Sequence, residues 1–352
     1  MMSSLTKRDK EKFMQRCIQL AKSGKLHAAP NPMVGAVIVH NHKIIGEGYH
    51  IKSGSAHAEV NAIQAVEKKE LLPQSTIFVS LEPCSHTGKT PPCADLIIES
   101  GIPQVIIGCQ DPFSQVAGNG IKKLQQAGVQ VEVGILEEQC KQLIRRFYTF
   151  HSKKRPYILL KWAQSADFFL DKIRDAGRPT ILSTPLSSLF THKRRAEVSA
   201  ILVGRKTALL DNPSLTTRHW YPKHPIRLVI DRNLSLPHNL HLFDGKVPTI
   251  VFTAKREQEN RENLEYISLD FTQDIIPQLL ATLYKRNIQS ILVEGGSTLL
   301  QSFIKCNLWD EIHIEQSQQL IGQGVPSPQL PNNSFETCKL LGSKFMLAHA
   351  KQ

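Results

Sequence analysis

The sequence predicts an α/β protein built from two consecutive domains. Its 352 residues exceed the length of about 150 residues that one ordinary domain occupies. Apolar strand-like runs alternate with amphipathic helical stretches in both halves, which is typical of sheets covered by helices. A basic stretch that ends in proline, SKKRP at 152–156, separates the halves. We therefore place the two domains at residues 1–150 and 151–352.

The first half is expected to form a three-layer sandwich. It opens with a helix at 6–24, because Phe13, Cys17 and Leu20 fall on one face and Gly24 follows. A last helix within 137–156 leads into the basic stretch. Strands are expected at 34–40, 75–82, 105–108 and 129–134, and helices at 56–71, 91–101 and 118–128.

The second half repeats the alternation without an evident sequence repeat. Its last predicted strand, 288–296, ends in a glycine pair and is followed by a helix, and the segment 317–333 reads as loop. The other predicted strands lie in 157–163, 199–209, 226–232 and 248–254.

Composition narrows the class of protein. Lys and Arg number 43 against 31 Asp and Glu, and the net charge of +12 favours phosphorylated or otherwise acidic partners without choosing among them. The seven scattered cysteines make a poor disulfide framework. The polar N-terminus lacks the apolar core of a signal peptide, and no run reaches the roughly 18 apolar residues of a membrane span. We expect a cytoplasmic protein with reduced thiols and no membrane partner.

Three metal-ligand side chains are predicted to converge in the first half. His57 starts a predicted helix, Cys84 follows a predicted strand, and Cys93 starts the next helix. One imidazole and two thiolates fill three of the four positions around zinc, and a water at the fourth has its pKa lowered to about 7. Glu59 is not needed as a ligand and is placed to carry the proton of the water to a leaving amine. This is the pattern of zinc nucleobase deaminases.

Other interpretations of the same residues stay open at this point. The cysteines could be unrelated core residues, or the zinc site could be closed and structural. A closed site needs a fourth soft ligand, and Cys109 is the obvious one.

Four segments of the first half resemble the deaminase half of the bifunctional riboflavin-biosynthesis deaminase–reductases: PNPMVGAVIV, AHAEVNA, LEPCSHTGKTPPCADLI and QDPFSQVAGNGI. The resemblance implies deamination of 2,5-diamino-6-ribosylamino-4(3H)-pyrimidinone 5′-phosphate at a zinc site of the cytidine-deaminase fold. It carries zinc binding onto His57, Cys84 and Cys93 and proton transfer onto Glu59. It also implies that Asn31 contacts the pyrimidine and that His50 and Lys89 face the ribose phosphate.

The second half holds three features that suit a dinucleotide and a phosphorylated sugar. The glycine pair before a helix lets backbone N–H groups approach a phosphate, although it is not the Gly-x-Gly-x-x-Gly fingerprint. A polar stretch from Thr207 to Arg218 follows a predicted strand. Lys161 lies inside an apolar strand, where a charge is costly unless it is paired or functional.

These features resemble the reductase half of the same family, which has a dihydrofolate-reductase-like fold. The resemblance implies that NADPH reduces the ribosyl group to the ribityl chain. We take Lys161 and Asp211 as candidates for proton handling near the sugar. Cofactor contacts are implied at Ala163, Thr207, Asp211 and the span from Gly296 through Ser297 and Thr298 to Ser302. Substrate contacts are implied at Arg195, Leu215, Arg218 and Glu294.

Two positions depart from the reductase pattern. Phe168 stands where many relatives have glycine, and Ile181 stands where relatives often have tryptophan. Both are expected to flank the nicotinamide pocket. The alternative hypothesis is therefore a deaminase whose second domain is weakened or inert.

A third hypothesis is a zinc-stabilised nucleic-acid-binding module. The basic residues are spread rather than clustered, and aromatic residues make up only 7% of the chain, so no nucleic-acid partner is expected. The expected partners are the phosphorylated ribosylaminopyrimidine and a second copy of the chain in a homo-oligomer.

Overall fold

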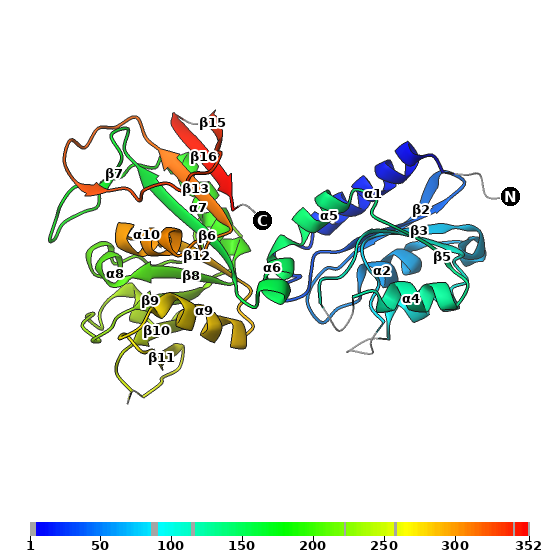
Figure 1. The fold of residues 1–352 in the computed structure, drawn as a ribbon, viewed down its shortest axis with the longest axis horizontal. Coiled ribbons are helices and arrows are strands. Elements are labelled where there is room, and N and C mark those ends of the chain that lie inside the picture. Colours follow the sequence, from blue (N-terminus) through cyan, green and yellow to red (C-terminus); the bar gives the residue numbers. More distant parts are fainter. Residues whose placement is uncertain are drawn as a thin grey trace. The chain divides into compact units, whose positions relative to one another are not determined.

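The computed structural model describes residues 5–85, 91–113, 117–221, 223–256, 259–340 and 342–350 (Figure 1). The chain divides into two compact units, Met1–Lys154 and Arg155–Gln352, each with its own sheet. Both units are mixed α/β, as the sequence predicts. None of the helices in these described ranges is long and apolar enough to cross a membrane.

Unit 1 is built on a five-stranded sheet in the order β2-β1-β3-β4-β5. Strand β1 is antiparallel to β2 and β3, whereas β3, β4 and β5 are parallel. Its strands are β1 Gly35–His40, β2 Lys43–Tyr49, β3 Thr76–Leu81, β4 Gln104–Cys109 and β5 Gln130–Val133. Its helices are α1 Lys7–Lys22, α2 Ala58–Ala65, α3 Cys93–Glu99, α4 Asn119–Gln126, α5 Glu137–Leu143 and α6 Arg145–Lys153, with a 3₁₀ turn at Lys69–Gln74.

Two apolar cores lie on opposite faces of this sheet. Helices α1 and α5 cover one face, and α2, α3 and α4 cover the other, so the unit is a three-layer sandwich (Figure 1). Nearly all residues of strands β1 and β3 are buried, because helices cover both faces of the sheet at these strands. Helices α2 and α3, which cover the second face, begin near the carboxyl end of β3, where the metal-ligand residues lie.

Two helices of unit 1 differ from the sequence prediction. The helix expected over 56–71 ends at Ala65, because Val66 turns to an extended backbone and buries its side chain against Gly46. The helix expected within 137–156 is two helices, α5 and α6, and the backbone of the buried Ile144 between them leaves the helical range. In both places a buried β-branched residue overrides the helical periodicity.

The described residues of unit 2 form a nine-stranded sheet in the order β11-β10-β9-β8-β12-β6-β13-β16-β15, with a separate β7–β14 pair. The strands from β11 to β13 are parallel, and β16 and β15 add antiparallel. The strands are β6 Tyr157–Gln164, β7 Phe169–Asp171, β8 Ala200–Gly204, β9 Ile226–Ile230, β10 Thr249–Thr253, β11 Leu264–Ser268, β12 Ser290–Gly295, β13 Glu311–Gln316, β14 Val325–Pro326, β15 Glu336–Leu340 and β16 Ser343–His349. The helices are α7 Pro185–Glu197, α8 Arg205–Asp211, α9 Ile275–Lys285 and α10 Ser297–Lys305, with a 3₁₀ turn at His241–Phe243.

Two apolar cores also cover the faces of this sheet. One contains residues of α9 and α10, and the other contains Ala208 of α8 together with buried leucines of the segment 215–242. Parallel strands that are covered on both faces leave their carboxyl ends as the open edge of the sheet. Strands β8 and β12 end there, at Gly204 and Gly295, and both residues border the large cavity described below.

Candidate active sites

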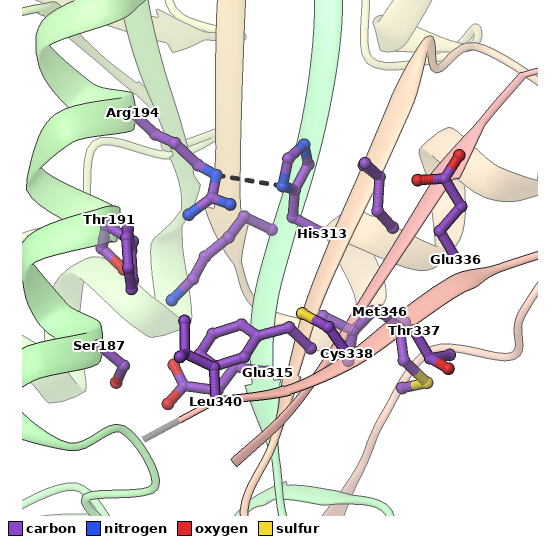
Figure 2. Close-up of a pocket in the computed structure, with 15 residues that line it drawn as sticks. Ser187, Thr191, Arg194, His313, Glu315, Glu336, Thr337, Cys338, Leu340 and Met346 are labelled. Carbon is purple, nitrogen blue, oxygen red and sulfur yellow. Dashed lines mark hydrogen bonds between the residues drawn. The ribbon is translucent and has the colours of Figure 1, made fainter. Parts of the chain in front are cut away.

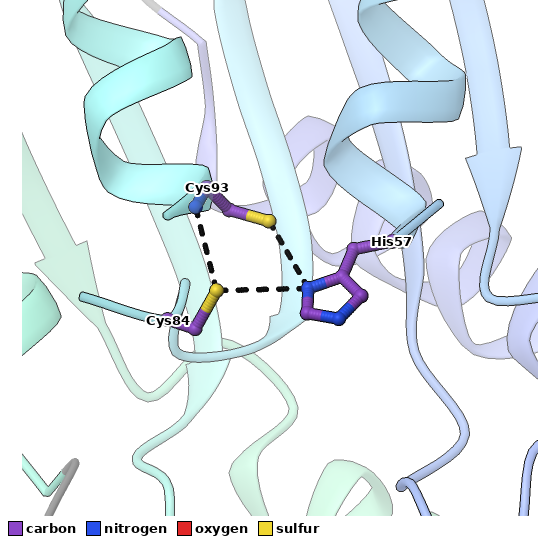
Figure 3. Close-up of side chains that lie close together, drawn as sticks. All are labelled: His57, Cys84 and Cys93. Atoms are coloured by element: carbon purple, nitrogen blue, oxygen red, sulfur yellow. Dashed lines mark hydrogen bonds between the residues drawn. The ribbon is translucent and has the colours of Figure 1, made fainter. Parts of the chain in front are cut away.

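Three metal-ligand side chains come together in unit 1 (Figure 3). His57 caps the N-terminus of α2, Cys84 follows β3, and Cys93 is the first residue of α3. The Nδ1 atom of His57 lies 3.2 Å from Sγ of Cys93 and 3.6 Å from Sγ of Cys84. The backbone N–H of Cys93 donates to Sγ of Cys84 at 3.3 Å, and the N–H of Ala94 donates to the Cys84 carbonyl at 3.1 Å. The two cysteines are thus held by the start of one helix.

The donor set fits zinc. The three ligand atoms lie within 4.8 Å of one another, and an imidazole with two thiolates is a borderline-soft set that zinc prefers. Hydrogen bonds from the Cys93 side chain, from His57 and from the Cys93 N–H hold the pKa of Cys84 well below its usual range, so the thiolate is available at neutral pH. The described His, Cys, Asp and Glu side chains form no other such cluster.

Cys109 does not take part in this site. Its buried thiol donates to the carbonyl of Ser80 at 3.5 Å and belongs to the core under α1 and α5, on the opposite face of the sheet from the ligands. The closed four-ligand site that Cys109 would complete is therefore not formed.

Glu59 lies in the first turn of α2 and is 3% exposed. Burial raises the pKa of this carboxyl group to about 7, and the nearby Cys84 thiolate adds to the shift. A carboxyl group that titrates near neutral pH can both take and give a proton. Position and pKa together suit the proton-transfer role that the sequence suggests.

Asn31 and His50 lie beside this cluster. The ring of His50 packs edge-on against that of His57, with 5.4 Å between centroids. The Asn31 amide nitrogen lies 3.1 Å from Nε2 of His50, and Nδ1 of His50 lies 3.1 Å from the carbonyl of Ala56. Both ring nitrogens of His50 thus have protein partners, and the ring is 2% exposed. This geometry lets His50 orient the Asn31 amide and leaves it no free nitrogen for a phosphate. Lys89 lies outside the described residues.

Glu82 is a residue of this site that the sequence analysis missed. It follows β3, is 3% exposed, and accepts backbone N–H groups from the connection before α4 and from the first turn of α4. Its donors are Asp111 at 3.3 Å, Gly118 at 3.0 Å, Gly120 at 2.9 Å and Ile121 at 3.3 Å. The backbone of Gly120 packs so closely on Pro83 that a Cβ there would lie 2.0 Å from the Pro83 carbonyl oxygen. The residue before the Pro83–Cys84 pair therefore ties a second loop to the ligand loop.

Unit 2 holds a cavity of about 670 Å³ at the carboxyl edge of its parallel strands. Its walls come from β6, β8 and β12 and from the first turns of α8 and α10. Nine of the residues named in the sequence analysis line it: Lys161, Ala163, Thr207, Asp211, Glu294, Gly296, Ser297, Thr298 and Ser302.

The Gly295–Gly296 pair has no side chains, so a ligand in this cavity can come close to the backbone there. A Cβ on Gly295 would lie 3.3 Å from Oγ1 of Thr207, and one on Gly296 would lie 3.2 Å from the same atom. Gly296 precedes α10, whose first N–H groups receive no side-chain cap. Backbone N–H groups that face a cavity next to a hydroxyl suit a phosphate. The residues present therefore fit the phosphates of a dinucleotide such as NADPH.

Lys161 is one of the residues that line this large cavity. It is shared with a second cavity of about 330 Å³ beneath α7, where β15 and β16 form one wall (Figure 2). Burial lowers the pKa of the Lys161 ammonium group, and the charges of Glu294 and Glu315 oppose the shift. In the second cavity the Arg194 guanidinium donates to Nδ1 of His313 at 3.1 Å (Figure 2).

Two predicted contacts are occupied by protein partners. Arg195 donates to both carboxylate oxygens of Glu294, at 3.0 and 2.6 Å, and also to the carbonyl of Thr216. Its two-pronged face therefore binds a protein carboxylate and not an open site for a substrate phosphate. Asp211 forms an ion pair with Arg174, which also contacts Asp171.

Leu215 and Arg218 are not among the described residues that line the reductase cavity. The side chain of Leu215 is 1% exposed in a hydrophobic core, so only its backbone can face a ligand. The Arg218 backbone N–H donates to Nδ1 of His192 at 3.0 Å, and its guanidinium donates to Thr216. The exposed Arg218 side chain keeps donors for an anion.

Phe168 and Ile181, the two residues that differ from the family's reductase pattern, do not form part of the cavity wall. Phe168 has a φ of +65°, which explains why glycine is usual there, and its side chain is 58% exposed. Ile181 is 75% exposed. Neither is among the described residues that border the cavity. Phe168 thus adopts the backbone of a glycine and turns its ring to the surface.

Comparisons with known proteins agree with the two sites. The family model described as the cytidine and deoxycytidylate deaminase zinc-binding region matches residues 7–109, and the one described as the RibD C-terminal domain matches residues 156–346. The riboflavin biosynthesis protein RibD of Aquifex aeolicus is 38% identical over 334 residues, covering 92% of this chain and 91% of the relative. That of Escherichia coli K12 is 35% identical, covering 89% and 88%.

Solved structures give the same result. The structure titled diaminohydroxyphosphoribosylaminopyrimidine deaminase/5-amino-6-(5-phosphoribosylamino)uracil reductase, from Thermotoga maritima, has a TM-score of 0.88 at 36% identity and covers 98% of this chain and 99% of that one. RibD of Acinetobacter baumannii, form 1, has a TM-score of 0.88 at 29% identity and covers 99% and 100%.

The fold and the two sites define a zinc-dependent deaminase joined in one chain to a nucleotide-dependent reductase. Zinc serves the first unit and NADPH the second. The chain belongs to the RibD family and is a bifunctional deaminase and reductase of riboflavin biosynthesis. The alternative of an inert second domain is not favoured, because the reductase model matches that half and its cavity is formed.

Proposed function

We propose that unit 1 deaminates 2,5-diamino-6-ribosylamino-4(3H)-pyrimidinone 5′-phosphate and that unit 2 reduces the ribosyl group of the deaminated product. The observation that carries this proposal is the cluster of His57, Cys84 and Cys93 with the buried Glu59 beside it. The same chain holds two further cavities in unit 2, and Lys161 lines both of them. The net charge of +12 is consistent with two phosphorylated ligands.

In the deamination, Glu59 moves the proton. His57, Cys84 and Cys93 hold zinc, which when bound supplies Lewis-acid activation of water at neutral pH. Glu59 moves the two protons of the attacking water, one to the adjacent ring nitrogen and one to the ring amine, which leaves as ammonia while the ring carbon becomes a carbonyl. A pKa of about 7 suits both halves of this transfer. Asn31, oriented by His50, holds the pyrimidine.

In the reduction, the protein places the sugar against the cofactor. NADPH supplies a hydride to C1′ of the opened ribosyl group. A proton must then reach the neighbouring nitrogen. Lys161 is the better donor of the two candidates, because Asp211 is paired with Arg174 whereas Lys161 lines both cavities with its pKa lowered by burial. Glu294, which lines the cavity, is held in place by Arg195, and Arg218 offers donors to the substrate phosphate.

The first test of this proposal is a mass spectrum of products after incubation of the purified protein with the diaminopyrimidine ribosyl phosphate and NADPH. We expect a product that is both deaminated and reduced. Ammonia release without NADPH oxidation would contradict the reductase role of unit 2. NADPH oxidation without ammonia release would contradict the role of unit 1.

We also propose a homo-oligomer in the cytoplasm. All seven cysteines are free, which is consistent with a reducing compartment. Sandwich deaminases often associate, and several large apolar side chains of α7, such as Leu186 and Phe190, are exposed. A sizing column that shows only monomer would contradict the oligomer.

A further inference from the structure

Arg218, which offers donors to the substrate phosphate, lies on a segment without regular secondary structure. Residues 212–221, which lead from α8 toward β9, form neither helix nor strand. Their backbone groups are not paired in a helix or a sheet, so they need other partners. Leu215 has a φ of +52° and is buried, whereas Arg218, three residues later, is exposed. The position of the Arg218 side chain thus depends on what holds this backbone.

Helix α7 binds the segment at two points. Nδ1 of His192 accepts the backbone N–H of Arg218 at 3.0 Å. Arg195, three residues further along the same face of the helix, donates to the carbonyl of Thr216 at 3.2 Å. Arg195 is itself fixed by both carboxylate oxygens of Glu294, which lines the large cavity. The segment is thereby tied to a wall of the reductase site.

His192 acts in this contact as a neutral acceptor. Its ring is 4% exposed and packs edge-on against the ring of His219, with 4.7 Å between centroids. An Nδ1 atom that accepts a hydrogen bond carries no proton, so the neutral ring has its proton on Nε2. Burial, followed by the charges of Arg195 and Arg218, lowers the pKa of His192 to about 4. The ring therefore stays neutral at neutral pH and keeps its acceptor for the Arg218 backbone.

A second histidine accepts the neighbouring N–H group. Nδ1 of His224 accepts the backbone N–H of Thr217 at 3.2 Å, and the Thr217 hydroxyl donates to the carbonyl of Lys223 at 3.0 Å. The Thr217 side chain is 2% exposed. These bonds close the segment on itself, whereas the bonds of His192 and Arg195 fix it to α7.

The Arg218 guanidinium projects from this fixed backbone. It donates from Nη1 to Oγ1 of Thr216 at 3.2 Å, and its other N–H groups suit a phosphate, which a planar guanidinium can bind with two parallel hydrogen bonds. An arginine on an unanchored segment would lose conformational freedom when it binds, and that loss would weaken binding. The anchoring by α7 removes this cost before the substrate arrives.

We propose that His192 is a positioning residue for the substrate phosphate in unit 2: by accepting the Arg218 N–H, it holds the segment so that the Arg218 guanidinium meets the phosphate. This inference rests on the proposed reductase function and adds a residue that acts through Arg218 without touching the substrate. The group recognised is the phosphate monoester of the sugar. The role of His192 is therefore confined to phosphorylated substrates.

Two variants separate the acceptor of His192 from its packing. His192→Phe keeps a ring beside His219 but cannot accept a hydrogen bond. His192→Asn loses the ring but places an amide oxygen close to the position of Nδ1. If the phenylalanine variant does not fold, His192→Leu, which also lacks an acceptor, replaces it. Thr184→Ala is the matched control, because it removes the side chain that caps the Ser187 N–H at the start of α7 and so weakens the same helix at its other end.

NADPH oxidation by the full-length protein is measured with the deaminated substrate and with the same compound after removal of its 5′-phosphate. In His192→Phe, KM for the phosphorylated substrate should rise by about 5- to 30-fold, the effect of one lost hydrogen bond, while kcat stays within about threefold. KM for the dephosphorylated substrate should stay within about twofold in every variant. The Thr184→Ala control should leave both KM values unchanged.

The other variants show whether the acceptor acts through Arg218. His192→Asn should keep KM within about threefold of the wild type, although it leaves a cavity and should unfold at a lower urea concentration. In an Arg218→Gln background, His192→Phe should have little further effect on KM, because the side chain that His192 positions is already lost.

Five outcomes would overturn the inference. Equal increases in KM for both substrates, or an equal effect of Thr184→Ala, would mean that His192 only stabilises the unit. An increase in His192→Asn as large as in His192→Phe would assign the effect to the ring and not to the acceptor. A wild type that uses both substrates equally well would remove the phosphate contact. A wild type that oxidises NADPH with neither substrate would overturn the reductase function itself, and this failure is distinct because it is seen without any variant.

Discussion

Glu59 and His50 show how far single residues could be predicted. The spacing of His57 and Glu59 predicts a ligand and a free carboxyl group, and the fold places Glu59 buried beside the metal ligands. The spacing does not show that both nitrogens of His50 are occupied, because Asn31 and Ala56 come from other segments. For the same reason the sequence could not show that Arg195 is paired with Glu294, a residue 99 positions away. Residue types were predictable, and their partners were not.

Glu59→Gln should separate metal binding from proton transfer. The amide keeps the size of the side chain but cannot carry a proton, so ammonia release should fall by about 10²- to 10⁴-fold. Zinc content, measured by atomic absorption, should stay near one per chain, whereas Cys84→Ser should lose zinc. Deamination at the wild-type rate in Glu59→Gln would contradict the proton-transfer role. NADPH oxidation with a substrate already deaminated is the control and should be unchanged.

His192 predicts a pH dependence of the stability of unit 2. Burial, followed by the charges of Arg195 and Arg218, lowers its pKa to about 4 from an ordinary value of 6.5. As the pH falls, His192 therefore becomes protonated near pH 6.5 in the unfolded chain but only near pH 4 in the folded unit. The free energy of unfolding should fall across this window as the pH falls, by up to about 3 kcal/mol. Above pH 6.5 the contribution should be constant.

Urea unfolding followed by tryptophan fluorescence measures this effect. The three tryptophans, Trp162, Trp220 and Trp309, all lie in unit 2, so the signal reports that unit alone. His192→Gln removes the titrating group, and its free energy of unfolding should depend less on pH between 7 and 4.5. If wild type and variant change in parallel over that range, His192 is not the cause.

At the scale of elements, the sequence predicted those with a strong local pattern. The buried strands β1, β3, β8, β9 and β12 were predicted as strands, because runs of Val, Ile and Leu bounded by turns mark strands that are covered on both faces. Strands β7, β11, β13, β14, β15 and β16 were missed. Strand β13 carries charged and polar residues at alternate positions that are paired inside the protein, as His313 is with Arg194 and Glu311, and β15 is exposed along its whole length.

The connection before α4 should depend on Glu82. Glu82→Gln replaces a carboxylate that accepts four N–H groups by an amide with one acceptor oxygen, so buried donors are left unpaired at about 1–3 kcal/mol in total. Hydrogen exchange measured by mass spectrometry should speed up in peptides that contain Gly118 and Gly120. Exchange in β5 serves as the internal control. Unchanged exchange at these glycines would show that the carboxylate does not hold the loop.

For the whole molecule, the two compact units predict separable chemistry. Each has its own sheet and its own cores, and they meet in the chain at Lys154–Arg155. The net charge of the chain favoured phosphorylated ligands but could not show where they bind. Net charge is a sum over all residues, whereas a binding site is formed by only a few of them. The fold supplies that placement by bringing His57, Cys84 and Cys93 together and by closing the Gly295–Gly296 cradle on Thr207.

A fragment of residues 1–154 should therefore fold and release ammonia at a rate within a fewfold of the intact protein. It keeps every described ligand and proton-transfer residue of the first site. Circular dichroism with a cooperative thermal transition would report folding, and an ammonia assay would report activity. A folded fragment without deaminase activity would show that unit 2 contributes to the first site.

The position of β6 in the sheet has a consequence for synthesis on the ribosome. Unit 1 is complete in sequence once residue 154 has emerged, so it can fold while the rest is made. Strand β6 begins at Tyr157, yet it pairs with residues 290–293 of β12 and 311–316 of β13. At about 5–20 residues per second, this apolar strand waits on the order of 10 s for its neighbours. During that time the chain carries an unpaired apolar strand C-terminal to unit 1, so we expect the nascent reductase to be more prone to aggregation than unit 1.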